Sequence, residues 1–148
     1  AYGSNMDKIQ MDKRCPGAVP LAICKKLNYR TILNTRGVAT IIPEEGSISY
    51  GILWKVTDEH VKSLDRYEGV PRLYHKVYLK GKDKTFLTYC MNSDTFALPS
   101  INYFESIQEG YKDFFGENKS ASKLISVSLG LNRTFWVRLS INKSMTSL

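Results

Sequence analysis

One carboxylate, Glu68, stands out because of its place on a predicted helix. The apolar spacing predicts a helix over residues 58–68. At about 100° per residue, Glu68 projects from the same face as Val61 and Leu64, which must pack against the rest of the domain. Burial and the negative end of the helix dipole both raise the pKa of a carboxyl in this position. A raised pKa suits a general base or acid that works near neutral pH.

The competing interpretation of Glu68 is that its side chain extends to solvent or forms an ion pair with an arginine. Arg66 and Arg72 are close enough in the sequence to pair with it, and structural ion pairs also account for carboxylates of this kind. Asp65 is a second carboxylate that faces inward on the same helix. Its short side chain near the helix end is more typical of a hydrogen-bonding anchor for a neighbouring loop. From the residues alone, each of the two carboxylates stays open to two interpretations, a catalytic group or a structural one.

A second candidate for chemistry is the segment Tyr2-Gly3-Ser4-Asn5. Glycine allows a ligand to approach the backbone closely, so successive N–H groups here could bind an anion or an oxyanion. The segment does not match a Walker or dinucleotide-binding loop. Taken alone, such a short turn is a weak signal.

Thiol and metal chemistry are both disfavoured by the cysteines and histidines. The sequence contains Cys15, Cys24 and Cys90, without a CxxC pair, and two histidines, His60 and His75. A Cys–His thiolate pair is an alternative, but Cys90 lies in an apolar strand, where a cysteine usually acts as a small hydrophobe. The sequence contains too few candidate ligands for a zinc site, so no metal is expected. Unpaired cysteines are typical of a reducing, cytoplasmic location.

The elements that must position these residues alternate between strands and helices. The patterns predict a helical turn at 6–11, a strand at 21–35, and hairpins at 38–56 (turn 43–46) and 74–91 (turn 81–84). Thr57 or Asp58 caps the helix at 58–68, and Gly69 ends it. A second helix follows Pro99-Ser100 and ends at Gly116. Short turns between neighbouring strands favour antiparallel pairing, so we expect one α+β domain.

Length, composition and charge narrow the class of protein. A chain of 148 residues with 43% hydrophobic and 24% charged residues is typical of one globular domain. No apolar run reaches the roughly 18 residues of a membrane-spanning helix, so no membrane association is expected. Residues 117–148 contain five basic side chains and one acidic side chain, and thus +4 of the net charge of +7. Nucleic-acid binding by the domain itself is therefore not expected.

Two regions are predicted from this charge distribution. Residues 1–116 form the domain, and residues 117–148 form a basic C-terminal extension. Apolar residues alternate within the extension, so it is interpreted as an extra hairpin or as a partly disordered segment.

Six segments, in this order, carry a resemblance to a known family. They are Tyr2-Gly3-Ser4-Asn5, 14–18, 37–43, 51–54, 64–70 and 99–103. Residues 1–115 thereby resemble the γ-glutamylcyclotransferase family, which is AIG2-like and includes γ-glutamylamine cyclotransferases. The resemblance implies a small mixed, largely antiparallel β-barrel with packed helices. It also implies a hydrophobic strand ahead of the loop, of which the sequence contains only Ala1, so an unpaired sheet edge is expected there.

The resemblance also implies a reaction. In this family the α-amine of a γ-glutamyl group attacks its own γ-carbonyl, which releases 5-oxoproline and a free amino acid or amine, a lyase outcome without a cofactor. Glu68 is then the general base and acid, and the implied substrate-binding residues are Tyr2, Gly3, Ser4, Asn5, Tyr74 and Tyr103. The form of the loop favours γ-glutamyl amino acids or γ-glutamylamines over glutathione. The oligomeric state stays open between a monomer and a homodimer.

A non-catalytic role is the alternative. A domain of the same fold could bind a small molecule or a protein, with the basic residues 117–148 contacting an acidic partner. Such association would weaken with salt and with removal of these residues.

Overall fold

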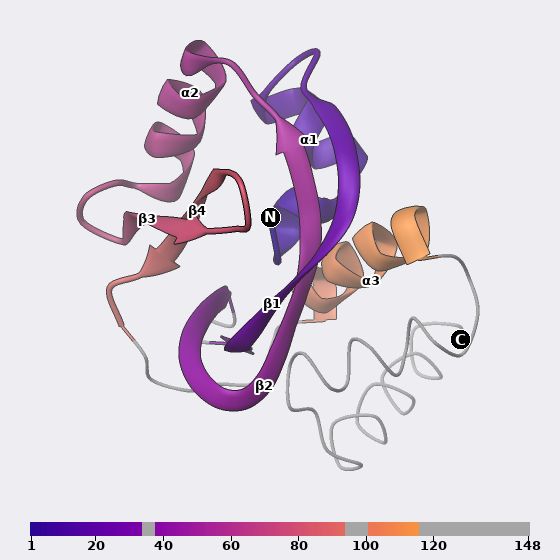
Figure 1. Ribbon diagram of the computed structural model, residues 1–148. Helices are drawn as coiled ribbons and strands as arrows, with labels where there is room; N and C mark the ends of the chain where they lie inside the picture. Colours follow the sequence, from indigo (N-terminus) through magenta and orange to yellow (C-terminus); the bar gives the residue numbers. More distant parts are fainter. Residues whose placement is uncertain (34–37, 94–100, 116–148) are drawn as a thin grey trace, which may run out of the picture.

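The computed structural model describes residues 1–33, 38–93 and 101–115, with the backbone alone for 101–104 and 115. The chain forms a mixed α+β domain (Figure 1). Its elements are η1 (Ser4–Met6), α1 (Lys8–Arg14), β1 (Val19–Leu33), β2 (Ala39–Lys55), α2 (Asp58–Glu68), β3 (Tyr74–Lys80), β4 (Thr85–Met91) and α3 (Ile101–Phe115). No helix in these described ranges has the length and apolar character needed to cross a membrane.

The long hairpin formed by β1 and β2 differs from the predicted one. The strands pair antiparallel from Val19 opposite Lys55 to Leu33 opposite Ala39, and β2 continues through the predicted turn at 43–46. Residues 44–47 oppose Asn28 alone and form a bulge. Gly46, at a φ of 77°, donates its N–H to Asn28 Oδ1 at 3.1 Å. The predicted hairpin turn at 43–46 was therefore wrong.

The second hairpin and the helix before it agree with the sequence pattern. Strands β3 and β4 pair in register from Tyr74 opposite Met91 to Lys80 opposite Thr85. Helix α2 is capped by Thr57, whose hydroxyl accepts the N–H of His60 at 3.2 Å. It ends at Gly69, which has the left-handed φ of 67°. This left-handed cap makes Glu68 the last helical residue.

The predicted barrel is not closed in the described part of the chain. The strands form two separate two-stranded antiparallel sheets, β1–β2 and β3–β4. The second edge of β2 pairs with a single residue there, because Ala1 and Ile52 exchange both backbone hydrogen bonds at 2.8 Å. The two sheets meet through side chains instead, as where Thr40 accepts the N–H of Met91 at 2.9 Å. Closure would need backbone pairing along that whole edge.

Two hydrophobic clusters hold the elements together. The first joins η1, β1, β2 and α3 through Met6, Leu33, Ala39, Ile52, Ile107 and Tyr111. The second joins α1, α2 and the β3–β4 hairpin through Met11, Cys15, Leu64, Tyr74 and Tyr89. Trp54 packs against both clusters. Ile107 and Tyr111 lie on the buried face of α3.

Candidate active site

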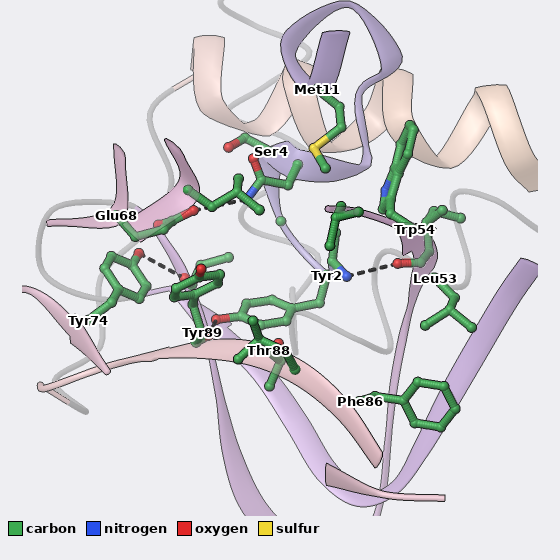
Figure 2. A pocket seen from close by; sticks show the side chains of 18 of the residues that line it. Tyr2, Ser4, Met11, Leu53, Trp54, Glu68, Tyr74, Phe86, Thr88 and Tyr89 are labelled. Atoms are coloured by element: carbon green, nitrogen blue, oxygen red, sulfur yellow. Dashed lines mark hydrogen bonds between the residues drawn. The ribbon is translucent and has the colours of Figure 1, made fainter. Parts of the chain in front are cut away.

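A cavity of about 330 Å³ lies between the N-terminal loop, α2 and the two sheets. Figure 2 shows its labelled side chains, with Glu68, Tyr74 and Tyr89 toward one end and Leu53, Trp54 and Phe86 toward the other. Within the described part of the chain, Glu68 is the one acidic side chain that lines it. The cavity therefore has two different ends. The polar end contains the Glu68 carboxylate, and the other end is lined mainly by apolar side chains.

Two glycines allow the N-terminal loop to reach its position. A Cβ atom at Gly51 of β2 would lie 2.1 Å from the carbonyl oxygen of Ala1. A Cβ atom at Gly110 of α3 would lie 2.6 Å from Cβ and 2.9 Å from the carbonyl carbon of Met6. Real atoms do not approach so closely, so only glycine lets β2 and α3 contact the two ends of this loop.

The loop turns so that its first amides remain available. Met6 and Asp7 donate their N–H groups to the carbonyls of Gly3 (2.9 Å) and Ser4 (3.1 Å), forming η1. The N–H groups of Gly3, Ser4 and Asn5 precede this turn, and no hydrogen bond within the described residues uses them. All three residues line the cavity. The arrangement can offer N–H donors to a negatively charged oxygen.

Glu68 reaches this loop from the end of α2. Its Oε1 accepts a hydrogen bond from Asn5 Nδ2 at 2.9 Å. Burial raises the pKa of Glu68, and the bond from Asn5 and the positive charge of Arg14 oppose that rise without cancelling it. Among the described residues, Glu68 forms no ion pair with Arg66 or Arg72. The ion-pair interpretation was therefore wrong.

The predicted tyrosines have different surroundings. Tyr2 donates its hydroxyl to the carbonyl of Tyr89, and Tyr74 donates its hydroxyl to the carbonyl of Ala39 at 3.1 Å. Both rings line the cavity. Their hydroxyl protons are thus engaged by the backbone, so they shape the cavity wall rather than point a donor into it. Tyr103 falls in α3, where its side chain lies outside the described part of the chain.

Asp65 is a hydrogen-bonding anchor, but it anchors strands and not the neighbouring loop that the sequence suggested. It accepts hydrogen bonds from the hydroxyl of Tyr89 at 2.7 Å and from Lys76 Nζ at 2.8 Å. Burial raises the pKa of Asp65, but these two bonds outweigh it and hold the pKa below its usual range. The carboxylate joins α2 to β3 and β4, and this fixes the helix that carries Glu68.

The Cys–His pair does not form among the described residues. Buried Cys15 lies near the backbone carbonyl of His60, at 3.7 Å from Sγ, whereas the His60 ring caps α2 and contacts the carbonyl of Pro16 at 3.0 Å. Burial raises the pKa of Cys90 to about 11. Nor does any group of three or more His, Cys, Asp or Glu residues come together there as a set of metal ligands.

Arg14 is the residue that the sequence analysis missed. Its guanidinium donates to Ser4 Oγ at 3.1 Å and also to Asn5, Gln10 and Tyr67. Arg14 lies at the end of α1, and these hydrogen bonds connect the loop to α2. Its place in the family-like segment 14–18 was the one available signal, because nothing in spacing alone predicts a contact across 53 residues with Tyr67.

Comparison with known proteins agrees with this arrangement. A family model described as gamma-glutamyl cyclotransferase, AIG2-like, matches residues 1–110. The chain belongs to the AIG2-like γ-glutamyl cyclotransferase family. It is therefore an enzyme of the γ-glutamylcyclotransferase type, as the resemblance implied.

Sequence relatives of this cyclotransferase family member include mammalian proteins. The gamma-glutamylcyclotransferase of Mus musculus is 31% identical over 129 residues, which cover 76% of this chain and 69% of that protein. The gamma-glutamylcyclotransferase of Homo sapiens is 28% identical, with the same coverage.

Solved structures share the fold of this family member. A structure named gamma-glutamyl cyclotransferase matches with a TM-score of 0.77 at 23% identity, and that of an uncharacterised Homo sapiens protein matches with 0.76 at 24% identity. Each alignment covers 95% of both chains. The α+β class predicted from the sequence is thus confirmed.

Proposed function

We propose that the chain converts a γ-glutamyl amino acid or a γ-glutamylamine to 5-oxoproline and a free amine. The observation that supports this most directly is that one carboxylate and one set of loop amides lie at the same cavity. Glu68 and the residues Gly3, Ser4 and Asn5 line the same cavity. A base and a cluster of N–H donors on one cavity are the two parts that an intramolecular acyl transfer needs.

Glu68 is the proposed proton acceptor and donor. The α-ammonium of the substrate becomes a nucleophile when it gives a proton to the Glu68 carboxylate, and its nitrogen then attacks the γ-carbonyl carbon. A C–N bond forms in the five-membered ring, and the C–N bond to the leaving amine breaks. Overall the attacking nitrogen loses two protons and the leaving nitrogen gains two. Glu68 transfers them in turn, so the reaction needs no redox partner.

The loop is proposed to stabilise the intermediate. Negative charge develops on the γ-carbonyl oxygen when the nitrogen adds, and the N–H groups of Gly3, Ser4 and Asn5 are the proposed donors. The cavity walls would hold the γ-glutamyl group in its folded conformation, since ring closure depends mainly on proximity.

The two ends of the cavity suggest which leaving groups fit. The γ-glutamyl group would lie toward Glu68, and the leaving amine would face Leu53, Trp54 and Phe86 at the apolar end. We therefore expect γ-glutamyl compounds with apolar amines to be substrates, because an apolar leaving amine would be buried against these side chains.

The test compares the wild-type chain with Glu68→Gln on a panel of γ-glutamyl dipeptides and γ-glutamylamines. Mass spectrometry measures 5-oxoproline, and we expect Glu68→Gln to lose about 10²–10⁴-fold in kcat. Glu59→Gln is the matched control, because Glu59 lies at the exposed start of the same helix and pairs with Lys62. Normal turnover by Glu68→Gln would rule out Glu68 as the base, and no 5-oxoproline from wild type would reject the proposed reaction.

A further inference from the structure

Arg14 makes more side-chain contacts than its position at the end of a short helix requires. One nitrogen, Nη1, donates to Ser4 Oγ at 3.1 Å and to Asn5 Oδ1. The other, Nη2, donates to Gln10 Oε1 and to the hydroxyl of Tyr67. The guanidinium also stacks on the Tyr67 ring, with Cζ 3.7 Å from the ring centroid. Arg14 thus binds the loop, its own helix and α2 at once.

The backbone of Arg14 is held to α2 as well. Its carbonyl accepts the hydroxyl of Ser63 at 2.7 Å. Ser63 and Tyr67 are one helical turn apart on α2, and Glu68 follows Tyr67 directly. Both the backbone and the side chain of Arg14 are therefore fixed relative to the helix that carries Glu68.

The hydrogen bond from Arg14 to Asn5 determines the orientation of the Asn5 carboxamide. A guanidinium has donors only, and a carboxylate has acceptors only, whereas an asparagine amide has one end of each kind. Asn5 lies between Arg14 and Glu68, with Oδ1 toward Arg14 and Nδ2 at 2.9 Å from Glu68 Oε1. With Arg14 in place, the amide cannot turn over without bringing its NH₂ group against a guanidinium.

This orientation matters most when Glu68 holds a proton. A protonated carboxyl is itself a donor and would otherwise favour a flipped Asn5 whose oxygen accepts from it. A fixed Nδ2 donor keeps the proton off Oε1, so the proton must reside on Oε2.

We propose that Arg14 is a positioning residue of the active site, which locks Asn5 as a donor to Glu68 Oε1 and so reserves Oε2 for the proton that the substrate gives up. This inference rests on the proposed function. Two positive charges face Glu68, the guanidinium of Arg14 and the amino group of Ala1, and both act in the same direction because they oppose the effect of burial on the pKa of Glu68. Glu68 then stays ionised at a pH where burial alone would protonate it.

The experiment measures how kcat/KM depends on pH in Arg14→Met, with Arg66→Met as the matched control. Arg66 is exposed on α2 two residues before Glu68, and its loss changes the net charge by the same amount. We expect the acid limb of the Arg14→Met profile to move up by about one pH unit. Arg14→Lys keeps the positive charge but loses the paired guanidinium nitrogens, so it should move the acid limb of the profile by less. Arg66→Met should leave it in place.

A second measurement does not depend on turnover. In chains labelled with ¹³C at the glutamate carboxyl, the Glu68 signal is assigned by its absence in Glu68→Gln and titrated by NMR. We expect a higher pKa for Glu68 in Arg14→Met, and a smaller rise in Arg14→Lys, which also serves if Arg14→Met does not fold. An unchanged Glu68 pKa, an equal loss of rate at every pH, or the same shift in Arg66→Met would overturn the proposal. A wild type without 5-oxoproline release would instead reject the proposed function, and the titration would still test Arg14.

Discussion

Glu68 is subject to opposing influences in the folded chain. Burial at the cavity favours the neutral acid, whereas the hydrogen bond from Asn5 and the charge of Arg14 favour the carboxylate. Burial dominates, so the pKa is raised above its ordinary value. A carboxylate of this kind is a stronger base than a solvent-exposed one while it still ionises, and this is what proton removal from an α-ammonium requires.

The raised pKa predicts the acid side of the rate profile. Glu68 must be ionised to accept a proton, so kcat/KM should rise with pH through its pKa. We expect the midpoint of this limb to lie above the roughly 4.3 of an ordinary glutamate. Initial rates of 5-oxoproline release between pH 4 and pH 8 measure it. A midpoint at or below the ordinary value would contradict the role assigned to Glu68.

The same shift predicts a cost in stability. A glutamate whose pKa is higher in the folded than in the unfolded chain stabilises the fold below its unfolded pKa, and this contribution is lost as pH rises through the folded pKa. Glu68→Gln lacks the buried charge, so its free energy of unfolding should equal or exceed that of wild type at pH 8. The advantage should shrink toward pH 4. Urea denaturation at both pH values checks this, and a Gln variant that is less stable at pH 8 would count against the burial of charge.

At the level of elements, the loop depends on the close approach of α3. Gly110→Ala places a methyl group against Met6, so either η1 or α3 must shift. Alanine favours a helix over glycine by about 1 kcal/mol, which offsets part of the loss in stability. We therefore expect a loss of about tenfold or more in kcat/KM with a comparatively small change in melting temperature. Glu109→Ala, at the neighbouring exposed position, is the control, and equal activity in the two variants would show that the loop is not seated by α3.

Elements with strong local signals were predicted correctly, and those decided by distant pairing were not. The β3–β4 hairpin and α2 follow from alternation and caps that lie within each segment. The segment 43–46 has the residues of a turn, but the same residues suit a bulge, and pairing with β1 decides between the two. Local sequence carries no information on that pairing. Barrel closure was likewise a question of which edges meet.

The candidate site was predicted in part for the same reason. The position of Glu68 at the end of a helix and the glycine of the loop are local features, and the family resemblance joined them. The Asp65 contacts with Lys76 and Tyr89 and the Arg14 contact with Tyr67 join different elements. Such contacts depend on how helices and sheets pack, which periodicity does not specify.

At the level of the whole molecule, the boundary between residues 1–116 and 117–148 remains a prediction. Among the residues that the structure describes, those that line the cavity lie between Ala1 and Tyr89. We therefore expect a chain without residues 117–148 to keep kcat/KM within about twofold and to keep the same order of preference among γ-glutamyl compounds, since substrate discrimination depends on contacts within the cavity. Steady-state kinetics on both chains measure this. A loss of activity on truncation, with turnover that falls steeply as salt is added, would favour a role for the basic extension in binding.

The packing of Met6 against Ile107 and Tyr111 has a consequence for the order of events during synthesis. Every described residue of the cavity wall has been translated once Tyr89 is in place, but the surface that seats the loop comes from α3 (Ile101–Phe115). A nascent chain paused between these points contains Glu68 and Asn5 but lacks α3, which holds the N-terminal loop in place beside Glu68. Catalytic competence should thus arise late, when the last described helix has emerged from the ribosome.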